Sequence, residues 1–203
     1  MSSTKNAPRR TQAERSEATT GQLVATARDL FARDGYAGTS LEAVSSEAGV
    51  TKGALYHHFG SKKELFEAVF RAEQQQLLTA LATAAGKEKD PWDGFFAGAK
   101  AYLEVSLDAG VQRITLLDAS SVLGWERMRE IEADYGLAML KEGLRQAVKA
   151  RRIRRRDVDA LAHLLFGALG EGAMYIAGEP DQRAALRRVT RDLKSILDAF
   201  AAQ

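Results

Sequence analysis

Two short helices joined by a tight turn are predicted by one segment, Thr39-Ser-Leu-Glu-Ala-Val-Ser-Ser-Glu-Ala-Gly-Val-Thr-Lys-Gly-Ala-Leu-Tyr-His-His-Phe59, which Gly60-Ser-Lys-Lys-Glu-Leu65 follows. Leu41, Val44 and Ala48 recur at helical spacing, so the first helix has one buried face. Gly49 comes where the chain must turn sharply, because glycine adopts positive φ angles without a steric penalty. A third helix is expected to begin directly behind the second.

The second helix is expected to carry a basic and aromatic outer face. Thr51 is a residue type that caps helices, while Leu55 and Phe59 lie on the inward side. Two helices with a glycine turn between them form a helix-turn-helix, whose second helix enters the major groove of DNA. We therefore expect DNA binding through an outer face made of Lys52, Gly53, Tyr56 and His57.

The same segment carries the signature of a known family. A Thr precedes the first helix, an Ala-Gly-Val turn and a Lys-Gly pair follow, and Leu-Tyr-x-His-Phe and Ser-Lys-x-x-Leu complete the pattern. Over about a quarter of the chain, the sequence thus resembles the TetR family of bacterial transcriptional regulators. The resemblance implies a homodimeric, ligand-responsive regulator, most often a repressor. The matching positions are Thr39, Ala48-Gly49-Val50, Lys52-Gly53, Leu55-Tyr56, His58-Phe59, Ser61-Lys62 and Leu65.

Each residue of the motif has an expected role on a pseudo-palindromic DNA operator. Lys52 is the best candidate for a base contact, because an ammonium group donates to guanine O6 and N7. Gly53 permits a close approach, and Ala54 can contact a thymine methyl group, where many similar proteins carry Thr or Ser. Tyr56 belongs to the same base-facing set, with a phosphate contact as its other role. Phosphate contacts are expected from Thr39, Ser40, Thr51, His57, His58 and Lys62. His58 has the alternative of supporting the motif from within.

Composition restricts the class of protein. With 203 residues, 28% of them charged and 45% hydrophobic, the chain is expected to be a soluble globular protein of one large or two small domains. Cysteine is absent, which excludes thiolate chemistry and suits a reducing cytoplasm. We expect no membrane span and no secretory signal. The net charge is only +2, so DNA binding has to depend on local charge. Because strand signals are missing, the sequence predicts an all-α fold.

The first half of the chain divides into three expected parts. Residues 1–19 contain Lys5, Arg9, Arg10 and Arg15, and predict a flexible basic arm that is either a solvated tail or reaches the DNA backbone. Residues 20–62 are expected to form the helix-turn-helix domain, with its first helix from Gln22 to about Tyr36. Residues 63–85 predict a connector helix. Capping boxes are expected at Thr39 with Glu42 and at Ser61 with Glu64.

Residues 86–203 are expected to form a ligand-binding and dimerisation domain that begins at a helix start, Asp90-Pro91. Five helices are predicted, over residues 92–107, 111–122, 125–149, 157–177 and 182–202. Aromatic, methionine and polar side chains within them predict a ligand pocket between helices, with ordinary core packing as the alternative. The pocket candidates are Phe96, Tyr102, Leu117, Asp118, Trp125, Met128, Tyr135, Met139 and Glu171, with Glu104 and Arg113 as further polar candidates.

The last two predicted helices are strongly apolar, and the glycines of the first suggest close helix packing. Paired with their symmetry mates, they are expected to form a four-helix dimer interface, with a purely intramolecular core as the alternative. A basic run between residues 149 and 156 precedes them, and it indicates a solvated loop or an anion contact. The expected interface residues are Leu161, Leu165, Gly170, Leu186, Val189, Leu193 and Leu197.

Catalysis is not expected from this sequence. Two of its three histidines, His57 and His58, belong to the DNA-binding motif, and His163 lies on an apolar helix. No metal-ligand spacing, phosphate-binding loop or dinucleotide fingerprint is present, so neither a metal nor a cofactor is expected. The alternative from another class is a DNA-associated interaction protein whose second domain binds a protein partner instead of a metabolite.

Overall fold

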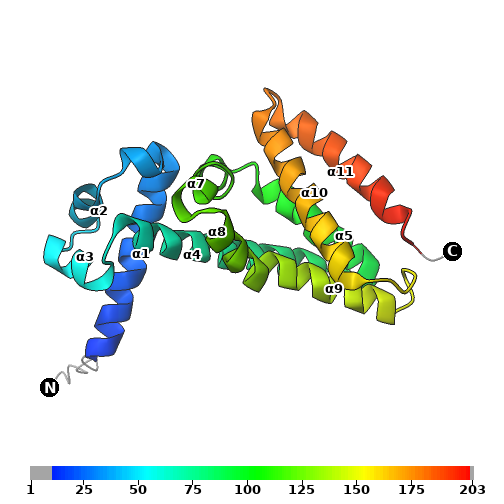
Figure 1. Cartoon of the computed structure of the whole chain (residues 1–203), viewed down its shortest axis with the longest axis horizontal. Helices are drawn as coiled ribbons and strands as arrows, with labels where there is room; N and C mark the ends of the chain where they lie inside the picture. Colours follow the sequence, from blue (N-terminus) through cyan, green and yellow to red (C-terminus); the bar gives the residue numbers. More distant parts are fainter. Residues whose placement is uncertain (1–10, 202–203) are drawn as a thin grey trace, which may run out of the picture. The chain divides into compact units, whose positions relative to one another are not determined.

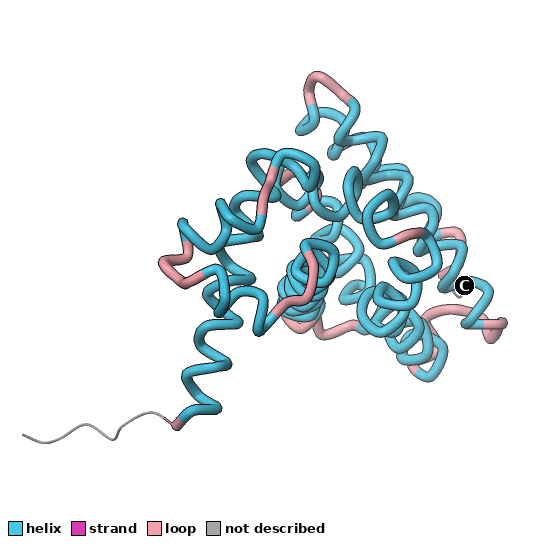
Figure 2. The backbone as a smooth tube through the Cα atoms, turned by 60° about the vertical axis from the view of Figure 1, so that its left-hand side comes forward, coloured by secondary structure: helices cyan, strands magenta, loops and turns pink. Residues whose placement is uncertain are grey.

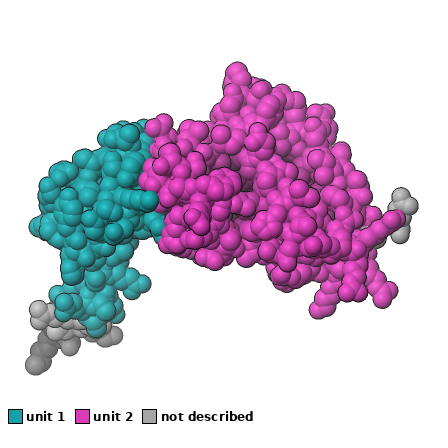
Figure 3. All heavy atoms as spheres, in the orientation of Figure 1, with its two compact units in different colours: residues 1–69 teal, residues 70–203 magenta. Residues whose placement is uncertain are grey.

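The computed structural model describes residues 11–201, and within this range the all-α prediction is confirmed (Figures 1 and 2). The chain splits into two compact units, residues 1–69 and 70–203 (Figure 3). The helices of the first half are α1 (Gln12–Gly38), α2 (Leu41–Glu47), α3 (Lys52–His58) and α4 (Lys62–Ala85). Those of the second half are α5 (Pro91–Val105), α6 (Ala109–Val111), η1 (Gln112–Asp118), α7 (Ala119–Leu123), α8 (Trp125–Glu132), η2 (Ala133–Leu137), α9 (Ala138–Lys149), α10 (Val158–Gly178) and α11 (Gln182–Asp198).

Helix α1 begins about ten residues earlier than predicted, so part of the expected flexible arm is helical. Thr11 and Glu14 form a capping box, in which the Glu14 amide donates to Thr11 Oγ1 (3.2 Å) and the Thr11 amide to Glu14 Oε2 (2.7 Å). Arg15 consequently lies on a helix. The other basic residues of the predicted arm, at positions 5, 9 and 10, lie outside the described residues.

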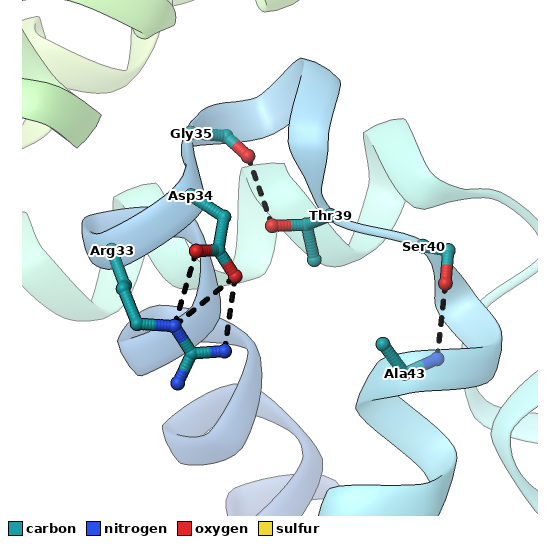
Figure 4. A network of polar contacts seen from close by, with 6 residues as sticks. All are labelled: Arg33, Asp34, Gly35, Thr39, Ser40 and Ala43. Atoms are coloured by element: carbon teal, nitrogen blue, oxygen red, sulfur yellow. Dashed lines mark hydrogen bonds and ion pairs between the residues drawn. The ribbon is translucent and has the colours of Figure 1, made fainter.

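The junction between α1 and α2 corrects the predicted capping box. Gly35 adopts φ 72° and bends the end of α1, as its glycine identity permits. Thr39 is 3% exposed, and its hydroxyl donates to the Gly35 carbonyl at 2.9 Å (Figure 4). Ser40 is the residue that caps α2, since its hydroxyl accepts from the Ala43 amide at 3.1 Å. The prediction of Thr39 as the cap is therefore wrong by one residue, because Thr39 terminates α1.

Lys62 anchors α4 to this junction. Its ammonium donates to the Tyr36 and Thr39 carbonyls, each at 2.8 Å, and lies 4.3 Å from the centroid of the Tyr36 ring. Tyr36 also packs against Phe31 and Phe66, with ring centroids 5.8 and 5.3 Å away. Carbonyl oxygens at a helix end lack partners within the helix, and a cation is favourable there. Lys62 is thus part of the architecture of the first unit, a role that the sequence did not indicate, and its phosphate contact stays a prediction.

Helix α4 continues without a break across the division between the units, which falls after Val69. Its start is capped by Ser61, whose hydroxyl accepts from the Glu64 amide at 3.1 Å. The Glu64 carboxylate accepts from the Gly60 amide at 3.0 Å instead of from Ser61, so the predicted capping box is only half formed. The predicted connector is therefore the rest of the same helix. The second unit resumes after it at Asp90, which caps α5 and is followed by Pro91 in the first turn, as predicted.

The second unit is built around a core between α5, α9, α10 and α11 (Figure 1). Helix α10 is by length and composition apolar enough to cross a membrane, but such a helix is equally typical of a protein core. Its inward residues do pack in this core. The buried members from α10 and α11 are Leu161, Ala162, Leu165, Leu169, Ile176, Ala185, Leu193 and Leu197.

Two π-helical segments interrupt helices that the sequence predicted as regular. Segment η1 lies within the predicted helix 111–122, and η2 lies within the predicted helix 125–149. A π turn closes its hydrogen bonds over five residues instead of four, and such turns are frequent at functional sites. The extra residue rotates the helix faces that follow, so a 3.6-residue periodicity no longer identifies the side chains that point inward.

The anchoring role of Lys62 predicts a local loss of stability in the variant Lys62→Met. Losing two hydrogen bonds from a charged donor should lower the local free energy of opening by about 1–3 kcal/mol. Hydrogen exchange of the amides between Thr39 and Val44 measures this opening directly. Lys63→Met, at the exposed neighbouring position, is the matched control. Equal exchange rates in the two variants would contradict the anchoring role.

Candidate functional site

Helix α3 turns a polar face to solvent in the first unit. Leu55 is fully buried and Phe59 nearly so, and they hold the helix against the unit. Tyr56 is 45% exposed, His57 is exposed, and a Cβ added to Gly53 would meet open space. The face that the sequence predicted to point outward is thus exposed. It is available to a groove of DNA.

Lys52 is held by an acidic partner on the preceding helix. Its Nζ lies 2.5 Å from Glu42 Oε1, and both side chains are exposed. The hydrogen bond between them lowers the pKa of Glu42 and raises the pKa of Lys52, so both stay charged. Because this pair is exposed to water, it contributes little stability, and Lys52 is easily released to another partner. The sequence did not indicate this pairing, because Glu42 was expected to form a capping box with Thr39.

The predicted phosphate contacts fall into two groups. Ser40 and Thr51 are exposed at the starts of α2 and α3, where each caps its helix, and His57 is exposed as well. His58 is half-buried, and its Nδ1 lies 3.1 Å from Thr20 Oγ1 on α1. It therefore supports the motif from within, which was the alternative considered for it. Thr39 and Lys62 face the interior junction described above.

The second unit contains a cavity of about 670 Å³. Its walls come from α4, α5, η1, η2, α9 and α10, so both π-helical segments contribute to it. Its volume lies within the range of small-molecule sites. The apolar side chains that line it include Leu77, Leu78, Leu81, Phe95, Val105, Leu116, Met139, Leu140, Phe166 and Leu169.

A few polar groups reach this apolar cavity. Gln74 of α4 lines it and is only 6% exposed. Tyr102 lines it from α5, where burial, and secondarily the charge of Glu132, raises the pKa of the phenol to about 12. Burial also raises the pKa of Glu132 itself, although Arg129 Nη1 lies 3.1 Å from the carboxylate. Burial is thus the largest cause of the pKa shifts of both Tyr102 and Glu132.

Three of the predicted pocket residues line the cavity, namely Tyr102, Tyr135 and Met139. Leu117 and Trp125 are instead 51% and 69% exposed. Leu117 and Asp118 lie in η1, where the π turn shifts side chains away from the 3.6-residue periodicity. The predicted residues that do not line the cavity are Phe96, Leu117, Asp118, Trp125, Met128 and Glu171, together with Glu104 and Arg113. Two of these residues pair with each other, since Arg113 Nε lies 3.3 Å from Asp118 Oδ2.

Sequence reasoning missed the contribution of α4 to the cavity. Gln74 and the leucines of α4 were assigned to a connector between domains. The available signal was the continued apolar periodicity at Leu77, Leu78 and Leu81, which a solvated connector does not need. Glu132 was missed because it lies at the end of α8, directly before a π-helical segment.

Most of the predicted dimer residues pack within one subunit. Leu161, Leu165, Leu193 and Leu197 are buried core residues, and Leu186 and Val189 pack partly buried against them. Gly170 has open space beside it. The four buried leucines are therefore core residues of their own chain, while a dimer contact through the partly buried Leu186 and Val189 stays a prediction. Different apolar residues of these two helices remain exposed, namely Leu164, Met174, Tyr175 and Ile196.

The basic run after α9 is tied to its own unit at two positions. Arg152 Nε lies 2.7 Å from Asp90 Oδ2, and the Arg156 guanidinium lies 4.6 Å from the centroid of the Phe200 ring. Arg151 adopts a left-handed φ of 58° in the loop. These contacts indicate a partly structural role for the run.

Two family descriptions match the chain. Residues 23–69 match "Bacterial regulatory proteins, tetR family", and residues 92–200, more than half of the chain, match "Tetracyclin repressor-like, C-terminal domain". The transposon Tn10 TetC protein of Escherichia coli is 29% identical over 77% of this chain and 79% of its own length. The transcriptional regulator CymR of Pseudomonas putida is 30% identical over 79% of this chain and 80% of its own length.

Solved structures agree with this assignment. A TetR-family transcriptional regulator from Pectobacterium atrosepticum is 34% identical, with a TM-score of 0.81 over 96% of this chain and 99% of that chain. With its exposed recognition helix, its all-α architecture and these matches along nearly its whole length, the chain belongs to the TetR family of DNA-binding transcriptional regulators.

Proposed function

We propose that this regulator is a homodimeric cytoplasmic repressor that leaves its operator when a small molecule occupies the cavity of the second unit. The observation that carries the proposal is α4, one uninterrupted helix that begins at the Lys62 anchor and also lines the cavity. A ligand that contacts this helix acts on an element shared with the DNA-binding unit. The regulators of this family are not known as enzymes, and no catalytic role is proposed.

On DNA, the exposed face of α3 would enter the major groove. Lys52 would leave Glu42 and donate to a guanine, while Gly53 and Ala54 allow close approach of the helix backbone. Tyr56, next to them, would reach a base edge or the adjoining phosphate. Ser40, Thr51 and His57 would contact phosphates, which fix the position of the helix without reading the sequence.

The ligand would act by preferring one arrangement of the protein over another. A ligand shifts an equilibrium only by the difference in its affinity for the two states. Ligand binding is supported by structural relatives, although at low identity: RolR, whose sequence is 19% identical, was solved with resorcinol, and FadR of Bacillus subtilis, 18% identical, with stearoyl-CoA. These ligands belong to those proteins, and they differ widely in size and charge.

The dimer would form through α10 and α11, whose exposed apolar side chains have no use in a monomer. Leu164 is 72% exposed on α10, and Tyr175 of α10 and Ile196 of α11 are exposed as well. Small residues between them, such as the open Gly167, allow a partner helix to approach closely. Two helices from each subunit would then form a four-helix interface, and the two-fold axis would match a pseudo-palindromic operator.

The alternative from another class, an interaction protein whose second unit binds a protein partner, requires a packed second unit. The cavity does not favour it.

The base-reading role predicts that Lys52→Ala weakens operator binding by roughly 5- to 100-fold and relaxes preference at one base pair. Selection from random DNA would identify the operator, and fluorescence anisotropy would then measure the affinity of both proteins for it. Lys87→Ala, an exposed lysine of the second unit, is the control. Unchanged affinity in Lys52→Ala would remove this residue from the base-reading set.

The interface role predicts that Leu164→Glu yields monomers, because it places a charge in an apolar contact. Sedimentation velocity measures the oligomeric state. Leu117→Glu is the control, since Leu117 is another exposed leucine (51%, against 72% for Leu164) but lies outside α10 and α11. A Leu164→Glu protein that still sediments as a dimer would rule out this interface.

A further inference from the structure

We propose that the effector is an uncharged, largely apolar molecule that carries a hydrogen-bonding group, and that Gln74 and Tyr102 hold this group. The inference rests on the proposed function, because it names the chemical class of the effector that would release the operator. It is argued from the unpartnered polar groups of the cavity and from the charges around them.

Gln74 places an amide in the wall of the cavity. The residue is only 6% exposed, and within residues 11–201 its side chain makes no hydrogen bond or ion pair. Its polar atoms are not fully enclosed, since Thr190 Oγ1 is the buried side-chain polar atom that lacks a partner among the described residues, so the amide stays accessible to a ligand in the cavity. The next glutamines along α4, Gln75 and Gln76, are exposed instead. An amide offers both donors and an acceptor to a ligand.

Tyr102 supplies a second neutral group from the facing helix α5. Its hydroxyl has no hydrogen-bond partner among the described residues, and its side chain lines the cavity. Burial raises the pKa of this phenol to about 12, so the group stays protonated near neutral pH. It can therefore donate one hydrogen bond and accept another without carrying a charge.

The charges of the lining disfavour an anionic ligand. Five carboxylates contribute to the cavity, and the single cationic side chain among its described lining residues, Lys89, is exposed. A carboxylate or phosphate inside the apolar walls would lack a partner and lose its hydration. The five carboxylates are those of Glu88, Asp90, Glu132, Asp134 and Glu142.

A cationic ligand is disfavoured for a different reason. The two less exposed carboxylates already have cations, Arg129 beside Glu132 at 3.1 Å and Arg152 beside Asp90 at 2.7 Å. Glu88, Asp134 and Glu142 are exposed, and water screens them. The interior therefore offers aromatic and aliphatic walls with neutral hydrogen-bonding groups, which matches a neutral ligand.

The test uses three probes on one scaffold: 4-butylphenol, 4-butylbenzylamine and 4-butylbenzoate. Isothermal titration calorimetry on the full chain measures their affinities, and 4-butylphenol is expected to bind most tightly. Gln74→Leu and Tyr102→Phe should each weaken its binding by roughly five- to tenfold. Gln76→Leu, at an exposed position on the same helix, should leave it unchanged.

A second readout separates this role from a merely structural one. Replacing an unpartnered buried amide by leucine should raise the melting temperature of the free protein, although it weakens ligand binding. If Gln74 only stabilised the fold, Gln74→Leu would lower both the melting temperature and the affinity for 4-butylphenol. Tighter binding of the amine or the benzoate, no binding of any probe, or unchanged phenol affinity in both variants would overturn the proposal.

Operator binding is measured separately by gel mobility shift. Failure to bind any selected DNA would count against the proposed function, whereas the calorimetry tests the class of ligand alone. Release of the operator by 4-butylphenol but not by 4-butylbenzoate would support both the proposed function and the proposed class of ligand.

Discussion

The backbone of α4 is the constraint on which the rest of the structure depends. Its hydrogen bonds run without interruption from Lys62 to Ala85, while the division between the two units falls inside it. At one end, two 2.8 Å hydrogen bonds from Lys62 tie it to the junction of α1 and α2. Further along, Gln74 and three leucines make it a wall of the cavity. The proposed coupling would act through this helix, because its residues belong to both units.

The cavity combines two requirements that conflict in an ordinary core. Apolar walls favour a dry interior, yet Gln74 and Tyr102 place polar atoms there without partners from the described chain. A ligand that carries a hydrogen-bonding group would supply the partners that these polar atoms lack. The π-helical segments η1 and η2, which also line the cavity, are a second departure from regular packing at the same place.

The sequence predicted the exposed face of α3 well, because helix periodicity and the turn at Gly49 determine which side of a short helix is buried. It could not distinguish Thr39 from Ser40 as the cap of α2, since both residue types cap helices and the choice depends on where α1 ends. The pairing of Lys52 with Glu42 and the anchoring by Lys62 are contacts between elements, which local patterns do not contain. The cavity was predicted only in part, because residue type and periodicity do not show which face of a helix lines a pocket, and because the π turn of η1 shifts the side chains of Leu117 and Asp118. For α10 and α11, a stripe of leucines alone did not separate a core from an interface.

The account as a whole depends on coupling between the cavity of the second unit and the DNA-binding face of α3. The most direct measurement is a closed thermodynamic cycle, with operator affinity determined with and without saturating 4-butylphenol and ligand affinity determined with and without operator. Both comparisons should give the same factor, about 5- to 150-fold, with each partner weakening the binding of the other. An operator affinity that is unchanged when the cavity is saturated would contradict the account.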